Sequence, residues 1–225
     1  MGIKERQERE RETVRRAILD AARELFVHEG YQNVSIRKIA ERVEYSPAAI
    51  YSYFPSKDDI FFALAEEGFR LLDGVTGECG ALESAAPLDR LRATLWRLYE
   101  FSRAQPQYFA LMFVDRSVPR IGREYERFSF ARDMKERFIE QARLCAERGE
   151  LRADVSPEVL IRLLTVGLLG VAVFRLSDRL GSGESADDLA REVLEVTIAG
   201  LRPGLPLKLP TPAYLGAVHQ DSAIS

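Results

Sequence analysis

The stretch 35–54 constrains the fold most, because it holds two short helical patterns with almost no chain between them. Ser35 suits a helix N-cap, and apolar residues follow it at helical spacing: Ile36, Ile39, Ala40 and Val43. Ser46 and Pro47 then open a second helix, because proline is tolerated in the first helical turn and the serine oxygen accepts an amide hydrogen bond. Two helices joined this tightly must cross, which predicts a helix-turn-helix.

The outward faces of these two helices suit DNA. Ile50 and Phe54 lie four residues apart and are expected to face a core, while the first helix carries Arg37, Lys38 and Arg42 on its polar side. Alanine methyl groups can contact thymine methyl groups in the major groove, and tyrosine hydroxyls and lysines can hold phosphates. The pattern favours a DNA-reading element, although an ordinary helical hairpin in an all-α core fits the same spacing.

Several separate motifs carry a family resemblance. The segments AILDAARELF (17–26), Gly30-Tyr31, Ile39-Ala40 and AIYSYFPSK (49–57) occur in this order, and residues 12–65 resemble the N-terminal domain of the tetracycline-repressor (TetR/AcrR) family. The resemblance implies an all-α fold with a three-helix helix-turn-helix DNA-binding domain in residues 1–57. A helical ligand-binding and dimerisation domain would follow in residues 58–203, and residues 204–225 would form a proline-rich tail.

The same resemblance assigns roles on DNA. Arg37 and the 47–49 segment would reach base edges, while tyrosines and a lysine would hold phosphates. The expected DNA-binding residues are Ser35, Arg37, Lys38, Ser46, Pro47, Ala48, Ala49, Tyr51, Ser52, Tyr53 and Lys57. One departure is Glu44, which stands in the turn where the family usually has glycine. If that position needs a positive φ, glutamate there stores roughly 1 kcal/mol of strain.

Net charge does not distinguish the expected DNA-binding region from the rest of the chain. The chain has a formal net charge of −3, and residues 1–58 carry 11 basic and 10 acidic side chains. DNA affinity must therefore depend on where the basic residues stand rather than on bulk charge. Residues 1–12 alternate basic and acidic side chains, which predicts a frayed or helical extension in solvent; alternatively, its basic members reach the adjacent minor groove. A further helix is expected over residues 13–29, closed by Gly30.

The rest of the chain repeats the 3.6-residue period, which predicts helices throughout. Ser56 and Asp59 start a helix that runs to about Leu72 or Asp73 and links the two domains. Aromatic residues and methionines are frequent in the helices that enclose the inducer in similar proteins, so a pocket for a small hydrophobic ligand is expected. Its expected lining is Phe62, Phe69, Trp96, Tyr99, Arg103, Tyr108, Met112, Phe113, Met134 and Phe138, although each of these residues also fits a plain core.

The region 163–174 is apolar on every side, so a helix there needs cover all round. We expect the helices in residues 156–180 and 186–201 to form half of an intermolecular four-helix bundle, with Gly167 and Gly170 permitting close approach. A homodimer would present two reading helices to a palindromic operator. The alternative is that both helices bury only each other and the monomer core.

Residues for catalysis or metal binding are not grouped in the sequence. His28 and His219 are far apart, and neither GxSxG, a phosphate-binding loop nor a dinucleotide fingerprint is present. We therefore expect no enzyme activity, no cofactor and no metal. Cys79 and Cys145 lack a CxxC pattern, which fits free thiols in a reducing cytoplasm, with a redox switch as the less favoured interpretation. The longest apolar run is about half a membrane span, so no membrane partner is expected.

The combined prediction is a cytoplasmic, ligand-responsive transcriptional regulator, most simply a repressor that releases its operator when a hydrophobic, aromatic or acyl ligand binds. Two alternatives remain at this point. One is a DNA-binding regulator without a small-molecule ligand, and the other is an all-α enzyme or hydrophobic-ligand-binding protein that does not read DNA.

Overall fold

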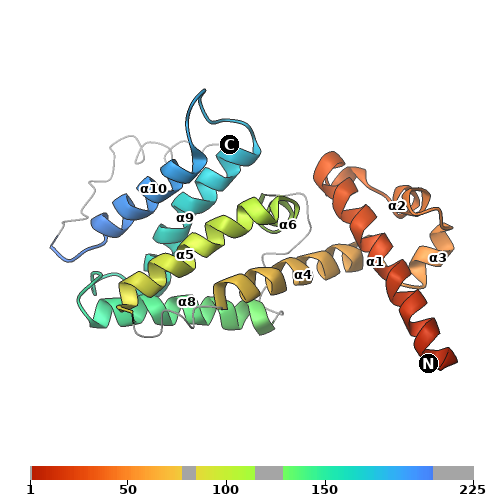
Figure 1. The fold of residues 1–225 in the computed structure, drawn as a ribbon, viewed down its shortest axis with the longest axis horizontal. Coiled ribbons are helices and arrows are strands. Elements are labelled where there is room, and N and C mark those ends of the chain that lie inside the picture. Colours follow the sequence, from red (N-terminus) through yellow and green to blue (C-terminus); the bar gives the residue numbers. More distant parts are fainter. Residues whose placement is uncertain (1, 78–84, 115–128, 205–225) are drawn as a thin grey trace, which may run out of the picture.

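The computed structural model describes residues 2–77, 85–114 and 129–204, and all regular secondary structure in these ranges is helical (Figure 1). This agrees with the all-α prediction. The proline-rich tail, apart from Gly204, and Cys79 lie outside the described residues.

The N-terminal domain packs three helices around a small core. It comprises α1 (Ile3–Glu29), the 3₁₀ turn η1 (Tyr31–Asn33), α2 (Ile36–Arg42) and α3 (Pro47–Tyr51). The predicted core residues are indeed inside, since Ile39 and Ile50 are fully buried and Phe54 is 4% exposed. The extension of residues 3–12 is helical and continuous with α1. Gly30 ends α1 with a φ of +81°, a conformation that glycine adopts without steric cost.

Helix α4 (Lys57–Gly77) leaves this domain and runs into the second one (Figure 1). It is longer than expected, because the sequence predicted an end at Leu72 or Asp73, before Gly74. Gly74 lies on the exposed side, while the opposite side stays packed through Leu72 and Thr76. The Thr76 hydroxyl donates to the Leu72 carbonyl at 2.9 Å. Because this side of the helix is packed, the helix continues past Gly74, which weakens it by only about 1 kcal/mol.

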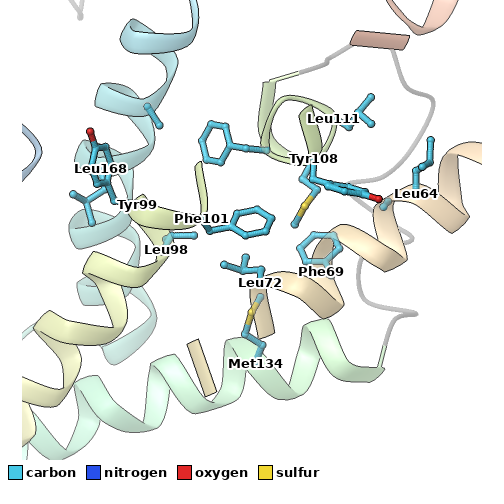
Figure 2. Close-up of a cluster of buried hydrophobic side chains, with 14 of the residues drawn as sticks. Leu64, Phe69, Leu72, Leu98, Tyr99, Phe101, Tyr108, Leu111, Met134 and Leu168 are labelled. Atoms are coloured by element: carbon cyan, nitrogen blue, oxygen red, sulfur yellow. The ribbon is translucent and has the colours of Figure 1, made fainter. Parts of the chain in front are cut away.

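The second domain consists of α5 (Pro87–Ala104), α6 (Pro106–Phe109), the π-helical turn η3 (Ala110–Val114), α8 (Ser129–Glu147), α9 (Pro157–Leu176) and α10 (Ala186–Gly200). After α6 the helix widens into the π turn η3. Helix α5 packs against α4, α8 and α9, and α10 packs on α9. Figure 2 shows the buried side chains that join α4, α5, α6 and α8. The α9/α10 pair lies on the side of the molecule away from the N-terminal domain (Figure 1).

Candidate functional site

The helix-turn-helix is closed by the predicted caps. Ser35 Oγ accepts from the Lys38 amide at 3.2 Å, and Ser46 Oγ accepts from the Ala49 amide at 3.1 Å. In the turn, the Tyr45 amide donates to the Ala40 carbonyl at 3.0 Å. Glu44 has a φ of +59°, so the position that resembles a family glycine does adopt the left-handed conformation. The strain expected for a non-glycine residue there is therefore present in this chain.

The exposed side of α3 carries small side chains and an aromatic one. Pro47, Ala48 and Ser52 are exposed, and Tyr51 is 54% exposed. Ala49 and Tyr53 are only partly exposed, so they contribute less to this surface than the sequence suggested. Tyr45 was not among the predicted contacts, although it is 45% exposed in the turn. Its position directly before the Ser46 cap was the signal that could have identified it. Glu41, Arg42 and Glu44 are also exposed. We call a subset of the exposed residues of α2, the turn and α3 the reading face: Arg37, Lys38, Tyr45, Ser46, Pro47, Ala48, Tyr51 and Ser52.

The basic residues of α2 each have an acidic partner on the protein. Arg37 pairs with Glu41 at 3.0 Å, and Arg42 with Glu24 at 3.0 Å, while Lys38 pairs with Glu29 of α1. All three pairs are substantially exposed, and exposed ion pairs contribute about 0–1 kcal/mol. Exchange of a carboxylate for a DNA phosphate or base edge would therefore cost little.

Lys57 occupies a different environment from the predicted one. Its ammonium donates to the carbonyls of Tyr31 at 2.8 Å and Val34 at 2.9 Å, and it lies 4.0 Å from the centroid of the Tyr31 ring. Partial burial lowers the pKa of Lys57, an effect that the neighbouring Asp58 opposes. Two of its three N–H groups are thus used to fix the start of α4 on the N-terminal domain, which leaves one for a phosphate.

The start of α4 has a second attachment to the same place. The Tyr31 hydroxyl donates to Asp58, and burial together with this carboxylate raises the pKa of Tyr31. The Tyr31 ring also packs against Phe26 and Phe61, with centroid separations of 5.2 and 5.4 Å. The start of α4 is therefore attached to the segment that directly precedes the helix-turn-helix.

A second set of polar contacts joins α1 to α4 and α6. Arg16 binds Glu67 at 2.6 Å and Asp20 at 2.6 Å, and these carboxylates raise the pKa of Arg16. The Arg23 guanidinium donates to the Tyr108 hydroxyl at 2.8 Å and lies 5.0 Å from its ring centroid. We call Arg16, Asp20, Arg23, Glu67 and Tyr108 the junction cluster. It is a direct link between the two domains that the sequence did not reveal.

A cavity of about 320 Å³ lies in the second domain between α4, α5, η3, α8 and α9. Four of the ten predicted ligand-binding residues line it: Phe69, Phe113, Met134 and Phe138. Leu72, Leu98, Ile139, Ile161 and Leu169 complete its apolar wall, and Lys135, Glu158, Arg162 and Thr165 supply its polar lining. Figure 2 shows Phe69, Leu72, Leu98 and Met134 converging from three helices.

Three predicted ligand-binding residues on α5 do not line this cavity. Tyr99 donates to Asp187 of α10 at 2.8 Å, and burial with this carboxylate raises the pKa of Tyr99 to about 12. Arg103 forms an ion pair with the same carboxylate at 2.6 Å. Trp96 donates to Glu100 at 3.0 Å and lies under the Arg191 guanidinium. These residues hold α10 on α5.

The other three predicted ligand-binding residues, Phe62, Tyr108 and Met112, are also absent from the cavity lining. Phe62 packs edge-on against Phe61 at 6.3 Å, and the Tyr108 hydroxyl belongs to the junction cluster. Met112 packs so closely on α4 that a Cβ atom added to Gly68 would lie 2.5 Å from its sulfur. Tyr108 and Met112 therefore connect η3 and α6 to α4 instead of facing a ligand.

Helix α9 leaves an apolar surface uncovered. Val166 is 60% exposed, Phe174 48% and Leu163 44%. These residues recur every three or four positions, and we call the set the outward stripe: Val159, Leu163, Val166, Gly170 and Phe174. Among the described residues, α9 is the one helix long and apolar enough to cross a bilayer, and its inner side packs on α5, α8 and α10. Gly170 has open space at its Cβ position, whereas Gly167 faces Val193 of α10 in the same chain.

Metal binding and thiol chemistry are the remaining kinds of site to consider among the described residues. Within the described residues, no group of three or more His, Cys, Asp and Glu side chains is placed to hold a metal ion. Cys145 is buried, which raises the pKa of its thiol to about 12 and disfavours the reactive thiolate.

A helix-turn-helix with an exposed reading face, joined by one long helix to a second helical domain with an apolar cavity, is typical of a DNA-binding regulator of transcription. Comparisons with known proteins agree. The family described as "Bacterial regulatory proteins, tetR family" matches residues 18–64. The HTH-type transcriptional repressor Rv1474c of Mycobacterium tuberculosis is 30% identical over 183 residues, which cover 78% of this chain and 87% of the relative. The chain belongs to the TetR family of transcriptional regulators, and it is not an enzyme.

Two further proteins show the same relationship over most of their length. The HTH-type transcriptional repressor AcnR of Corynebacterium diphtheriae is 29% identical over 199 residues, covering 85% of this chain and 93% of the relative. The crystal structure of Thermus thermophilus FadR, a TetR-family repressor in complex with lauroyl-CoA, superposes with a TM-score of 0.57 at 25% identity, covering 88% of this chain and 98% of FadR.

Proposed function

We propose that this chain is a cytoplasmic homodimeric repressor that binds a palindromic operator and releases it when a small apolar or acyl ligand enters the 320 Å³ cavity. The observation that carries the proposal is the position of α4. Its middle lines the cavity through Phe69 and Leu72, while its first residue, Lys57, donates hydrogen bonds to the carbonyls of Tyr31 and Val34, directly before the helix-turn-helix. A ligand that displaces the middle of α4 would therefore reorient the reading face.

The outward stripe supports the dimer. A row of exposed apolar residues on a long helix is costly in water, and packing against a second copy would bury it. Two reading faces placed about one DNA turn apart would then contact successive major grooves on one side of the duplex. On each half-site, Arg37 would reach base edges, and Pro47 and Ala48 would make apolar contacts with thymine methyl groups. Tyr45 and Tyr51 would hold phosphates with the remaining N–H of Lys57.

The cavity lining supports a ligand with an apolar body. Nine of its thirteen lining residues are aliphatic, aromatic or methionine side chains, while Lys135, Glu158 and Arg162 are exposed where the cavity meets solvent. An acyl chain or flat aromatic compound would fill the interior, and a polar end would remain near these charged residues. FadR of Thermus thermophilus, which binds lauroyl-CoA, makes acyl compounds the first candidates to test.

Release requires the ligand to bind the DNA-free arrangement more tightly than the DNA-bound one, because equal affinity for both would shift nothing. The junction cluster gives the two arrangements a structural basis. Arg16 and Arg23 connect α1 to Glu67 of α4 and Tyr108 of α6. Movement of α4 against α6 must change this set of contacts.

Operator binding is tested by selecting bound duplexes from a random-sequence pool and footprinting the enriched sequence. We expect a palindromic site, and a non-palindromic site bound by a single protomer would contradict binding as a dimer.

Release by a ligand is tested by titrating acyl-CoAs and free fatty acids of increasing chain length into the operator complex. Met134→Trp, which fills the cavity, should retain operator binding and abolish release, whereas Lys135→Gln at the rim should retain release. A cavity-filled variant that still responds would exclude this cavity as the ligand site.

A further inference from the structure

The first turns of α1 form one wall of an open groove beside α3. The groove has a volume of about 1130 Å³, and its other wall consists of Tyr45, Ser52 and Tyr53 of the helix-turn-helix. Arg6, Arg9 and Arg11 line it on the α1 side. In Figure 1 these turns of α1 (red) project past α3 on the side away from α2. The groove thus shares Tyr45 and Ser52 with the reading face.

Three of the four acidic residues in this part of α1 gather on one side of the helix, although the sequence alternates basic and acidic residues. At about 100° per residue, Glu5, Glu8 and Glu12 fall within a sector of about 60°, and none of them lines the groove. Glu10 is the one acidic residue in the lining, and it pairs with Arg6 at 3.1 Å in an exposed contact. An exposed pair of this kind is weak and can be exchanged for a phosphate. The helical conformation therefore turns a balanced sequence into a basic groove wall.

Contacts with the end of α3 hold this wall in place. The Arg11 guanidinium donates to the Ser52 carbonyl at 3.5 Å and lies 5.6 Å from the centroid of the Tyr53 ring. One turn later, Arg15 lies 5.3 Å from the centroid of the Phe54 ring. The direction in which α1 leaves the domain is thus set by the same residues that end the reading helix, so the basic wall is in position before DNA arrives.

The helical form decides which part of DNA this wall can meet. An α-helix with side chains is about 10–12 Å across, whereas the minor groove of B-DNA is about 6 Å wide. The extension therefore does not enter the minor groove as an extended arm would. The sugar-phosphate strand that borders the major groove remains as the available contact. It presents negative charges in a row that arginine side chains can follow.

We propose that Arg6 and Arg9 bind phosphates of the DNA strand that flanks the major groove occupied by α3. This inference rests on DNA binding by the helix-turn-helix and adds a sequence-independent contact to each reading head. Glu10 opposes the contact, so its charge limits the affinity. The extension strengthens attachment to any duplex without choosing the sequence.

The test is a salt titration on a mixed-sequence duplex of about 30 base pairs, with affinity measured by fluorescence anisotropy between about 50 and 200 mM KCl. Log affinity falls linearly with log salt concentration, and each phosphate contact makes this negative slope steeper by about 0.9. For each extension in contact, R6Q/R9Q should lower the slope by about 1.8, so the loss of affinity across this range becomes about 12-fold smaller. E10Q should bind more tightly than the parent.

The matched control is Arg148→Gln with Arg202→Gln, which makes the same change in net charge at exposed sites of the second domain. Its slope should equal that of the parent. Circular dichroism on each variant verifies that α1 remains helical. An R6Q/R9Q slope equal to that of the parent, or a control that falls by the same amount, would overturn the proposal. If the parent itself bound the duplex at no salt concentration, DNA binding by the helix-turn-helix would fail as well, which is a separate and visible outcome.

Discussion

Val166→Glu should separate the proposed dimer. Val166 stands in the middle of the outward stripe of α9 and is 60% exposed in the single chain. In a twofold dimer the same stripe on each protomer would meet its copy, so one substitution alters the interface twice. In the isolated protomer the new carboxylate points into solvent, and its fold should be unaffected.

The size of the effect follows from the exposed fraction. Fully burying a valine side chain contributes about 1.5–3 kcal/mol, and 60% of that area remains available, which gives about 1–2 kcal/mol per protomer. Twofold symmetry doubles the loss to about 2–4 kcal/mol, before any penalty for placing carboxylates in an apolar interface. The dimer dissociation constant should therefore rise at least about 30-fold.

Sedimentation velocity over a concentration series measures this constant directly. Leu71→Glu is the matched control, because Leu71 is 39% exposed on α4, outside the outward stripe. The control should dimerise like the parent. If Val166→Glu left the dissociation constant unchanged while circular dichroism showed a folded protein, the outward stripe would not be the dimer interface. The reasoning from exposed apolar surface would then be refuted.

Three further outcomes are expected. Gly167→Ala should destabilise the protein by about 1–2 kcal/mol in urea unfolding, because the new Cβ would lie 2.3 Å from Val193 Cγ1 and overpacking outweighs the gain in helix propensity; adding Val193→Ala should relieve this clash. Asp20→Asn should make the free energy of unfolding fall less steeply as the pH is lowered into the acid range. The Arg16 hydrogen bond lowers the pKa of Asp20, so its contribution is present above the unfolded value near about 4 and is lost as pH falls through the folded one; a steep acid limb in the variant would contradict this. Lys57→Gln should cost about 1–3 kcal/mol of stability and reduce the salt slope of DNA binding by at most about 0.9 per head, which separates its structural role from its phosphate contact.

The local structure of the helix-turn-helix was predictable from the sequence for a physical reason. Caps, prolines and apolar spacing act over three or four residues, so Ser35 and Ser46 cap the helices that they were predicted to cap. Glu44 adopts the positive φ that the turn requires, and the buried positions of α2 and α3 are those predicted. Helix ends were less certain, because α4 continues past Gly74 through packing on its other side.

The functional surfaces were only partly predictable. The spacing of apolar residues states how far around a helix two side chains lie, but not which neighbouring helix each side chain meets. Tyr99 and Arg103 were expected in the ligand cavity and instead meet Asp187 of α10. Gly167 was expected to approach a second chain and instead accommodates Val193 of its own chain. Lys57 was expected to face phosphate and instead uses most of its donors on carbonyl groups of the fold.

The sequence by itself determined the positions of most helices and their caps, because these depend on short-range hydrogen bonding and periodicity. The class of protein was predictable because several motifs in residues 12–65 resemble a known family, and the comparisons confirm it. Only the tertiary structure decided which residues enclose the cavity, which contacts form the junction cluster, and that the charged start of α1 presents arginines toward α3. Each of these depends on residues far apart in the chain meeting at particular angles, and those angles are set by the packing of whole helices.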